Sequence, residues 1–186
     1  MDRKSELIGK ILEIELQWFL TVNPELTAEC QQHPETFKVI RESIFETWSE
    51  KTLSLYLEQL VDAQNNGKNL MREKYAKIDN MIPCVNISPT IYDIVKIEEC
   101  WHKEAMDKYP HVFRREAGKG FVTYLQCELD AYSQATLESY MNNLAMALAE
   151  GRNLVIEGYT RIAQKLGYSS LRVWNQQARS SGDEHG

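Results

Sequence analysis

The chain contains two similar segments, and this repetition constrains its fold more than any other feature of the sequence. Residues 37–78 align without a gap with residues 121–162 at an offset of 84, and thirteen of the 42 pairs are identical. The match continues upstream at an offset of 83, with the pairs Ile11/Ile94, Ile14/Ile97, Glu15/Glu98 and Trp18/Trp101. Self-similarity over this length indicates a duplicated structural unit.

The apolar residues of both segments recur at helical spacing. Leu53, Tyr56, Leu60 and Ala63 follow one another at intervals of three and four, and the second segment repeats the same residue types. This period is typical of an amphipathic helix, and no segment shows sustained strand alternation. The sequence therefore predicts an all-α protein.

Short motifs predict where the helices begin and end. Ser49 and Ser133 stand where a side-chain oxygen would cap a helix, and Ser88-Pro89 is a helix-start signal. Gly67 and Gly151 occur at matching positions. Either each glycine ends a helix, so that Asn69 or Asn153 begins the next one, or it allows another backbone to approach closely.

These signals predict a single domain over residues 1–186. We expect a helical repeat at 7–80, a connector at 81–90, a second repeat at 91–166, a last short helix near 170–177 and a frayed tail at 179–186. The two multi-helix units are expected to be related by a pseudo-two-fold axis.

Charge and composition exclude several classes of protein. A net charge of −6 argues against a nucleic-acid-binding surface, which requires a basic face. No stretch approaches the roughly 18 consecutive apolar residues that cross a membrane, and the charged N-terminal residues argue against a secretory signal. Four cysteines without C-x-x-C spacing are typical of thiols in a reducing cytoplasm. We expect a cytoplasmic protein whose partner is an unknown small molecule or protein.

Four glutamates recur at matching positions and are the candidate metal ligands. Glu15 and Glu98 lie on the apolar side of their predicted helices, and Glu73 and Glu157 share an N-L-x-x-E-x-Y frame. If the units pack about a dyad, these acids converge from four helices, and carboxylate ligands favour a divalent cation such as Mg²⁺, Mn²⁺ or Ca²⁺. The other interpretation is structural, with the acids bonded to Tyr, Trp or basic side chains.

Paired aromatic residues extend this set of candidates. Their hydroxyl and indole groups either line a ligand pocket with the acids or form internal hydrogen bonds within the core. The candidate ligand-binding residues are Glu15, Trp18, Tyr56, Glu73, Tyr75, Glu98, Trp101, Tyr140, Glu157 and Tyr159.

Several motifs give the chain a family resemblance. They are W-F-L-T-V-N-P at 18–24, P-E-T-F at 34–37, W-S-x-x-T-L-x-x-Y-L at 48–57, G-K-N-L-M-x-E-K-Y-A at 67–76 and Y-L-x-C-E-L at 124–129. Over residues 8–166 the chain resembles the bacterial family known as domain of unknown function 4125. The resemblance implies a bacterial, cytoplasmic protein and brings no reaction, cofactor or catalytic residue.

The sequence therefore favours a non-catalytic binding or interaction module whose central groove accepts a ligand or a partner helix. The alternatives are a carboxylate-metal enzyme with acids from both repeats and an accessory subunit that acts through its outer surface.

Overall fold

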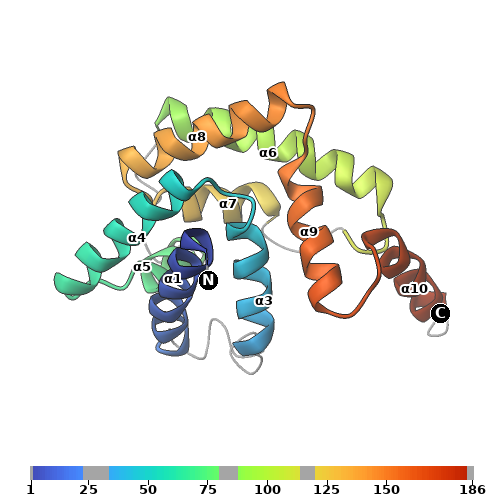
Figure 1. Cartoon of the computed structure of the whole chain (residues 1–186), viewed down its shortest axis with the longest axis horizontal. Coiled ribbons are helices and arrows are strands. Elements are labelled where there is room, and N and C mark those ends of the chain that lie inside the picture. The colour runs from blue at the N-terminus through green and yellow to red at the C-terminus, as the bar shows by residue number, and fades with distance from the viewer. Residues whose placement is uncertain (1, 23–33, 80–87, 114–119, 184–186) are drawn as a thin grey trace.

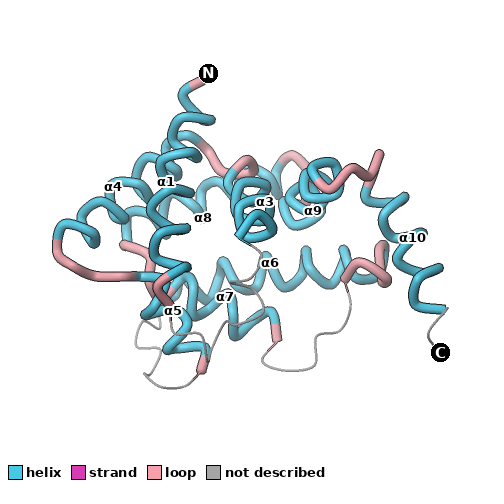
Figure 2. Tube along the Cα trace, turned by 90° about the horizontal axis from the view of Figure 1, so that it is seen from below, coloured by secondary structure: helices cyan, strands magenta, loops and turns pink. Residues whose placement is uncertain are grey.

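A computed structural model describes residues 2–22, 34–79, 88–113 and 120–183, with side chains described as far as residue 180. Regular structure within these ranges is helical throughout (Figures 1 and 2). The helices are α1 (Arg3–Leu20), α3 (Pro34–Phe45), α4 (Glu50–Asn65), α5 (Leu70–Ile78), α6 (Pro89–Lys108), α7 (Phe121–Leu129), α8 (Gln134–Ala149), α9 (Leu154–Lys165) and α10 (Leu171–Asp183).

The helix starts predicted from the sequence are confirmed. The Ser49 and Ser133 hydroxyls accept hydrogen bonds at 3.2 Å from backbone amides in the first turns of α4 and α8. Ser88 caps α6 in the same way at 3.2 Å. Asn69 and Asn153 cap α5 and α9 at 2.9 and 3.0 Å. Each cap satisfies an amide that has no partner within its own helix.

The two matching glycines end helices α4 and α8. Gly67 has a φ of +68° and Gly151 a φ of +67°. The amides that follow them, on Lys68 and Arg152, donate back to the Ala63 and Ala147 carbonyls at 2.9 and 2.8 Å. This is the bonding pattern of a left-handed C-terminal cap. No atom lies within 4 Å of a Cβ added at either glycine, so the capping interpretation is confirmed and close backbone approach is not the cause.

The helices pack as two groups that meet along several contacts (Figure 1). Helix α1 contacts α3, α4 and α5, and helix α6 contacts α7, α8 and α9. The groups are joined by contacts of α4 with α8, α3 with α9 and α5 with α7. Buried side chains from both groups form one main core, which includes Ile11, Phe45, Leu60, Ile94 and Leu144.

Helix α10 lies beside α9 at one end of the molecule (Figure 2). It is longer than the 170–177 helix expected from the sequence, because it continues to Asp183. Its Leu171 is buried against Ala105 and Phe113, and the Asn175 side chain accepts a 2.9 Å hydrogen bond from the His111 amide. These contacts anchor it to the end of α6.

Parts of the sequence-based expectations lie outside the described residues. These are most of the 81–90 connector, the last three residues of the predicted tail, and two of the four cysteines, Cys30 and Cys84. Of the two cysteines within the described ranges, Cys100 is exposed and Cys127 is buried, and neither forms a disulfide.

We predict that Gly67→Ala and Gly151→Ala each lower the free energy of unfolding by about 1 kcal/mol, because a side chain at positive φ is strained. The matched control is Gly9→Ala. Gly9 lies within α1, and a Cβ added there meets nothing within 4 Å. This control should raise stability by about 0.5–1 kcal/mol. Urea unfolding measures all three variants, and stabilisation by Gly67→Ala would contradict the capping role.

Candidate functional site

A buried ionic cluster lies where the two helix groups meet. In α1 the Glu15 carboxylate is fully buried and accepts bonds from Arg41 Nε at 2.8 Å and Nη2 at 2.6 Å. It also accepts the Tyr56 hydroxyl at 2.7 Å. Helices α1, α3 and α4 therefore meet at a single carboxylate.

The same arginine binds a second carboxylate from the other helix group. Arg41 Nη1 donates to Glu128 in α7 at 2.6 Å. Glu128 also accepts bonds from Lys74 Nζ at 2.9 Å and from the Tyr132 hydroxyl at 2.8 Å. We call Glu15, Arg41, Tyr56, Lys74, Glu128 and Tyr132 the Arg41 network. It contains two cations and two carboxylates, and each carboxylate accepts three hydrogen bonds.

The ionisation of the Arg41 network follows from this pairing. Burial opposes charge on Glu128, but Arg41 and Lys74 outweigh it and hold the pKa of its carboxyl well below the usual range. Burial also opposes charge on Arg41, yet Glu128 and Glu15 raise the pKa of its guanidinium. Burial, together with the neighbouring carboxylates, raises the pKa values of the Tyr56 and Tyr132 hydroxyls well above 10.0. The two tyrosines therefore act as neutral donors.

A cavity of about 20 Å³ lies against the Arg41 network. This volume suffices for one water molecule and for little more. The remaining residues of its lining are Trp18, Leu70, Met71 and Ala131. The centre of the described helices thus offers a water-sized space where the sequence suggested a ligand groove.

Glu98 occupies a contrasting environment in the second helix group. It is buried in α6 and accepts the Tyr140 hydroxyl at 2.7 Å. Within the described ranges it forms no ion pair with Lys or Arg, because the position that corresponds to Arg41 holds Leu125. Burial raises the pKa of Glu98 to about 7, and the Tyr140 hydrogen bond offsets only part of that effect.

The structure brings some of the candidate residues together and separates others. Glu15, Trp18 and Tyr56 share the central cavity, while Glu98 pairs with Tyr140 near the buried Trp101. Two of the four glutamates, Glu15 and Glu98, are thus buried beside tyrosines. Tyr75 is tilted against Phe19, and Tyr159 packs on Phe113.

The other two glutamates lie nearer the surface. Glu157 binds Arg152 at 2.7 Å and Arg161 at 3.7 Å, whereas Glu73 is half-buried in α5. Arg152, acting against partial burial, is the main cause of the lowered pKa of Glu157. Across the described part of the chain, no group of three or more His, Cys, Asp and Glu side chains is arranged to hold a metal ion.

Sequence reasoning missed four members of the Arg41 network, namely Arg41, Lys74, Glu128 and Tyr132. One signal was available, since Arg41 lies four residues from both Phe37 and Phe45 and therefore on the apolar side of α3. None of the four recurs in the other segment, so the repeat did not single them out.

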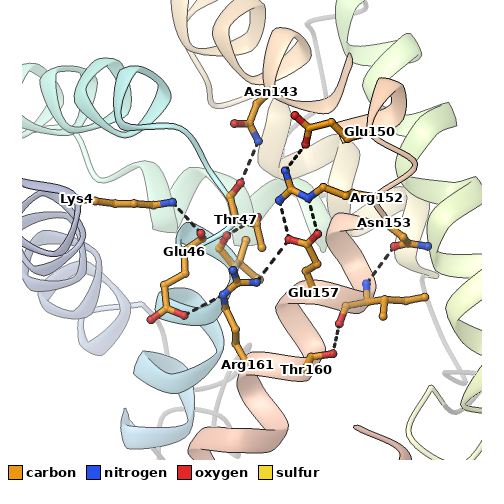
Figure 3. A network of polar contacts seen from close by, with 12 residues as sticks. Lys4, Glu46, Thr47, Asn143, Glu150, Arg152, Asn153, Glu157, Thr160 and Arg161 are labelled. Atoms are coloured by element: carbon orange, nitrogen blue, oxygen red, sulfur yellow. Dashed lines mark hydrogen bonds and ion pairs between the residues drawn. The ribbon is translucent and has the colours of Figure 1, made fainter. Parts of the chain in front are cut away.

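A larger hollow lies on the outer surface, among α1, α3 and α9. It has a volume of about 360 Å³ and is lined by Asp2, Lys4, Ser5, Ile8, Gly9, Leu12, Glu42, Glu46 and Arg161. We call it the α1–α3–α9 cleft. Lys4 Nζ donates to the Glu46 carbonyl at 2.8 Å, and Arg161 Nε lies 3.3 Å from the Glu46 carboxylate (Figure 3). Burial and the nearby Arg161 guanidinium lower the pKa of Lys4.

A third hollow, of about 480 Å³, lies between α1 and α4. Ile14, Leu57 and Val61 form its apolar part, and Lys10, Glu13, Gln17 and Gln64 complete its lining. Both of its helices belong to the first helix group, whereas the α1–α3–α9 cleft combines side chains from both groups.

These features define an all-helical protein with a buried ionic junction and charged residues in an outer cleft. The chain matches the model of a family described as a protein of unknown function (DUF4125) over residues 5–176, and it belongs to that family. No curated protein and no solved structure gives a significant match. Among the described helices, none is long and apolar enough to cross a membrane.

We predict that the stability of the protein falls as the pH rises from 5.5 to 8. Glu98 has a folded pKa of about 7, above its ordinary value of 4.5. The folded state therefore holds a proton that the unfolded chain releases, and the resulting stabilisation is lost as the pH rises through the folded pKa. The expected loss is about 2 kcal/mol. Urea unfolding across this range should show that the free energy of unfolding of the wild type decreases with pH. In Glu98→Gln this decrease should be smaller, whereas the control Glu99→Gln, at an exposed residue, should show the same decrease as the wild type. An unchanged slope in Glu98→Gln would contradict the assignment.

A second prediction concerns Arg41. Replacement by leucine leaves Glu15 without its ionic partner in the core and should lower the free energy of unfolding by about 3–5 kcal/mol. Exposed Arg72→Leu in α5 is the control and should change it by about 0.5 kcal/mol or less. The double variant Arg41→Leu/Glu15→Leu should lose about 1 kcal/mol less free energy of unfolding than the two single variants lose together. Strict additivity would show that the two residues do not interact energetically.

Proposed function

We propose that this chain is a non-catalytic binding module whose ligand site is the α1–α3–α9 cleft. One observation carries the proposal. A hollow of about 360 Å³ combines an apolar surface, from Ile8 and Leu12, with charged groups contributed by three helices. Its volume lies within the range of ligand sites, and polar groups from different helices converge on it, as they do in such sites.

The hydrogen bonding of the Arg41 network favours a ligand site in the outer cleft over one at the centre of the protein. Its two carboxylates already accept three hydrogen bonds each from within the protein. The adjacent cavity of about 20 Å³ admits nothing larger than a water-sized group. The role best suited to these central residues is to fix the packing of the helices that border the cleft.

We further propose that the two helix groups are duplicated units related by a pseudo-two-fold axis. Exchanging α1, α3, α4 and α5 with α6, α7, α8 and α9 leaves the main contacts among these eight helices unchanged, and α10 has no counterpart in the exchange. Hydrogen bonds also pair at matching positions. Gln59 donates to the Ala131 carbonyl, and Asn143 donates to the Thr47 carbonyl. The Lys77–Asp130 ion pair corresponds in the same way to Arg161–Glu46.

The duplicated units differ at the cleft itself, which supports a specialised role for the α1 side. Gly9 lines the cleft, and a Cβ added there meets nothing within 4 Å. Glycine inside a helix costs about 1 kcal/mol relative to alanine, so its presence needs a reason. The corresponding residue of α6 is Tyr92. A ring at position 9 would extend into the cleft, whereas glycine leaves that space open.

The test is a blocking variant, Gly9→Tyr, compared with Gly9→Ala. Both proteins and the wild type are heated with a panel of amino acids, carboxylates, amines, sugars and nucleotides. A ligand present at about 100 times its Kd should raise the midpoint of unfolding by about 5–10 °C in the wild type and in Gly9→Ala. Gly9→Tyr should lose this shift while it keeps a cooperative transition.

Two results would overturn the proposal. A shift of equal size in Gly9→Tyr would place the binding site elsewhere on the protein. If no compound of the panel shifts the unfolding midpoint of the wild type, the cleft does not bind these small molecules. The hollow between α1 and α4 would then be tested as a binding site for a partner protein.

A further inference from the structure

The charged groups of the α1–α3–α9 cleft identify the kind of ligand that it would accept. Asp2, Glu42 and Glu46 supply three carboxylates, and Lys4 and Arg161 supply two cations. Lys165 adjoins the cleft and binds Glu42 and Glu46, each at 2.8 Å. The cleft therefore carries groups of both signs at close quarters, and a ligand with both an anionic and a cationic group can pair with each of them.

Part of the cleft can hold an anionic group. Lys4 Nζ donates one hydrogen bond, to the Glu46 carbonyl, so two of its three N–H donors remain for a ligand. Arg161 uses Nε and Nη1 in its ion pairs with Glu46 and Glu157, which leaves Nη2. Figure 3 shows Lys4 reaching from α1 and Arg161 from α9 toward Glu46. A ligand carboxylate could therefore accept bonds from two helices.

Another part of the cleft can hold a cation. Glu42 in α3 uses one carboxylate oxygen for Lys165, and its side chain is 42% exposed. Its other oxygen can accept a charge-assisted hydrogen bond from a ligand ammonium. Asp2 also has one carboxylate oxygen engaged, which accepts the Ser5 amide at 2.8 Å and caps α1. We assign the ammonium to Glu42, which lies in α3 beside Lys165.

The apolar part of the lining comes from α1. Ile8 is buried and Leu12 half-buried along the same face of α1, with the open position of Gly9 beside them. We propose that the cleft binds a small aliphatic zwitterion, an α-amino acid with an aliphatic side chain. The carboxylate contacts Lys4 and Arg161, the ammonium contacts Glu42, and the side chain packs on Ile8 and Leu12. This inference rests on the proposed binding function of the cleft and names its ligand class.

Isothermal titration calorimetry with three probes tests the inference on the full chain. The probes are L-leucine, 3-methylbutylamine, which lacks the carboxylate, and 4-methylpentanoate, which lacks the ammonium. L-leucine should bind the wild type about tenfold or more tightly than either analogue, since each analogue leaves one charged partner unsatisfied.

Two variants separate the contacts, with a control on the same helix. Lys4→Met should weaken L-leucine and 4-methylpentanoate about tenfold and leave the amine unchanged. Glu42→Gln should weaken L-leucine and the amine and leave 4-methylpentanoate unchanged. Lys10→Met removes an exposed lysine of α1 that is outside the lining of the cleft, and it should leave all three affinities unchanged.

The outcomes distinguish this inference from the proposed function. If an analogue with one charge binds as tightly as L-leucine, the zwitterion inference is wrong while the cleft remains a binding site. If none of the three probes binds, but another compound stabilises the wild type and not Gly9→Tyr, the ligand class is wrong and the function stands. If L-leucine binds Gly9→Tyr as well as it binds the wild type, the inference and the proposed function both fail.

Discussion

The rest of the structure depends on the neutralisation of two buried carboxylates by Arg41. Glu15 and Glu128 come from different helix groups, and an isolated charge in the core would be very unfavourable. The planar guanidinium of Arg41 donates to both, with Nε and Nη2 on Glu15 and Nη1 on Glu128. Lysine could not reproduce this arrangement, because it carries a single nitrogen. The arginine thereby ties α1 to α7 through α3.

This junction also determines the borders of the outer cleft. The Arg41 network includes side chains from α1 and α3, and these two helices form two walls of the α1–α3–α9 cleft. Binding sites are most selective when rigid elements hold their polar groups. The hydrogen bonds of the Arg41 network are made within the protein, which suits these residues to fixing how the helices pack. The charged groups of the cleft are partly exposed, so they can contact a ligand.

Two glutamates at matching positions of the sequence repeat differ in their environment. Among the described residues, Glu15 has a guanidinium and a tyrosine hydroxyl as partners, whereas Glu98 has a tyrosine hydroxyl and no cation. Leu125 stands where the first segment has Arg41, so the second segment lacks the cation that neutralises Glu15 in the first. The consequence is a pKa of about 7 for Glu98, which leaves that residue sensitive to pH near neutrality.

The sequence by itself determined the local structure. Helical periodicity and the Ser49, Ser88 and Ser133 caps depend on neighbours within a turn or two, so they could be read from the chain. For Gly67 and Gly151 the chain left two interpretations open, and the positive φ of both residues decided between them. The repeat also singled out Glu15, Tyr56, Glu98 and Tyr140, and the structure pairs each glutamate with its tyrosine. Only the tertiary structure decided that Arg41 and Lys74 meet Glu128, which is separated from them by 87 and 54 residues. It alone assembled the outer cleft from α1, α3 and α9. Contacts between distant segments depend on how whole helices pack, and no short-range pattern encodes them.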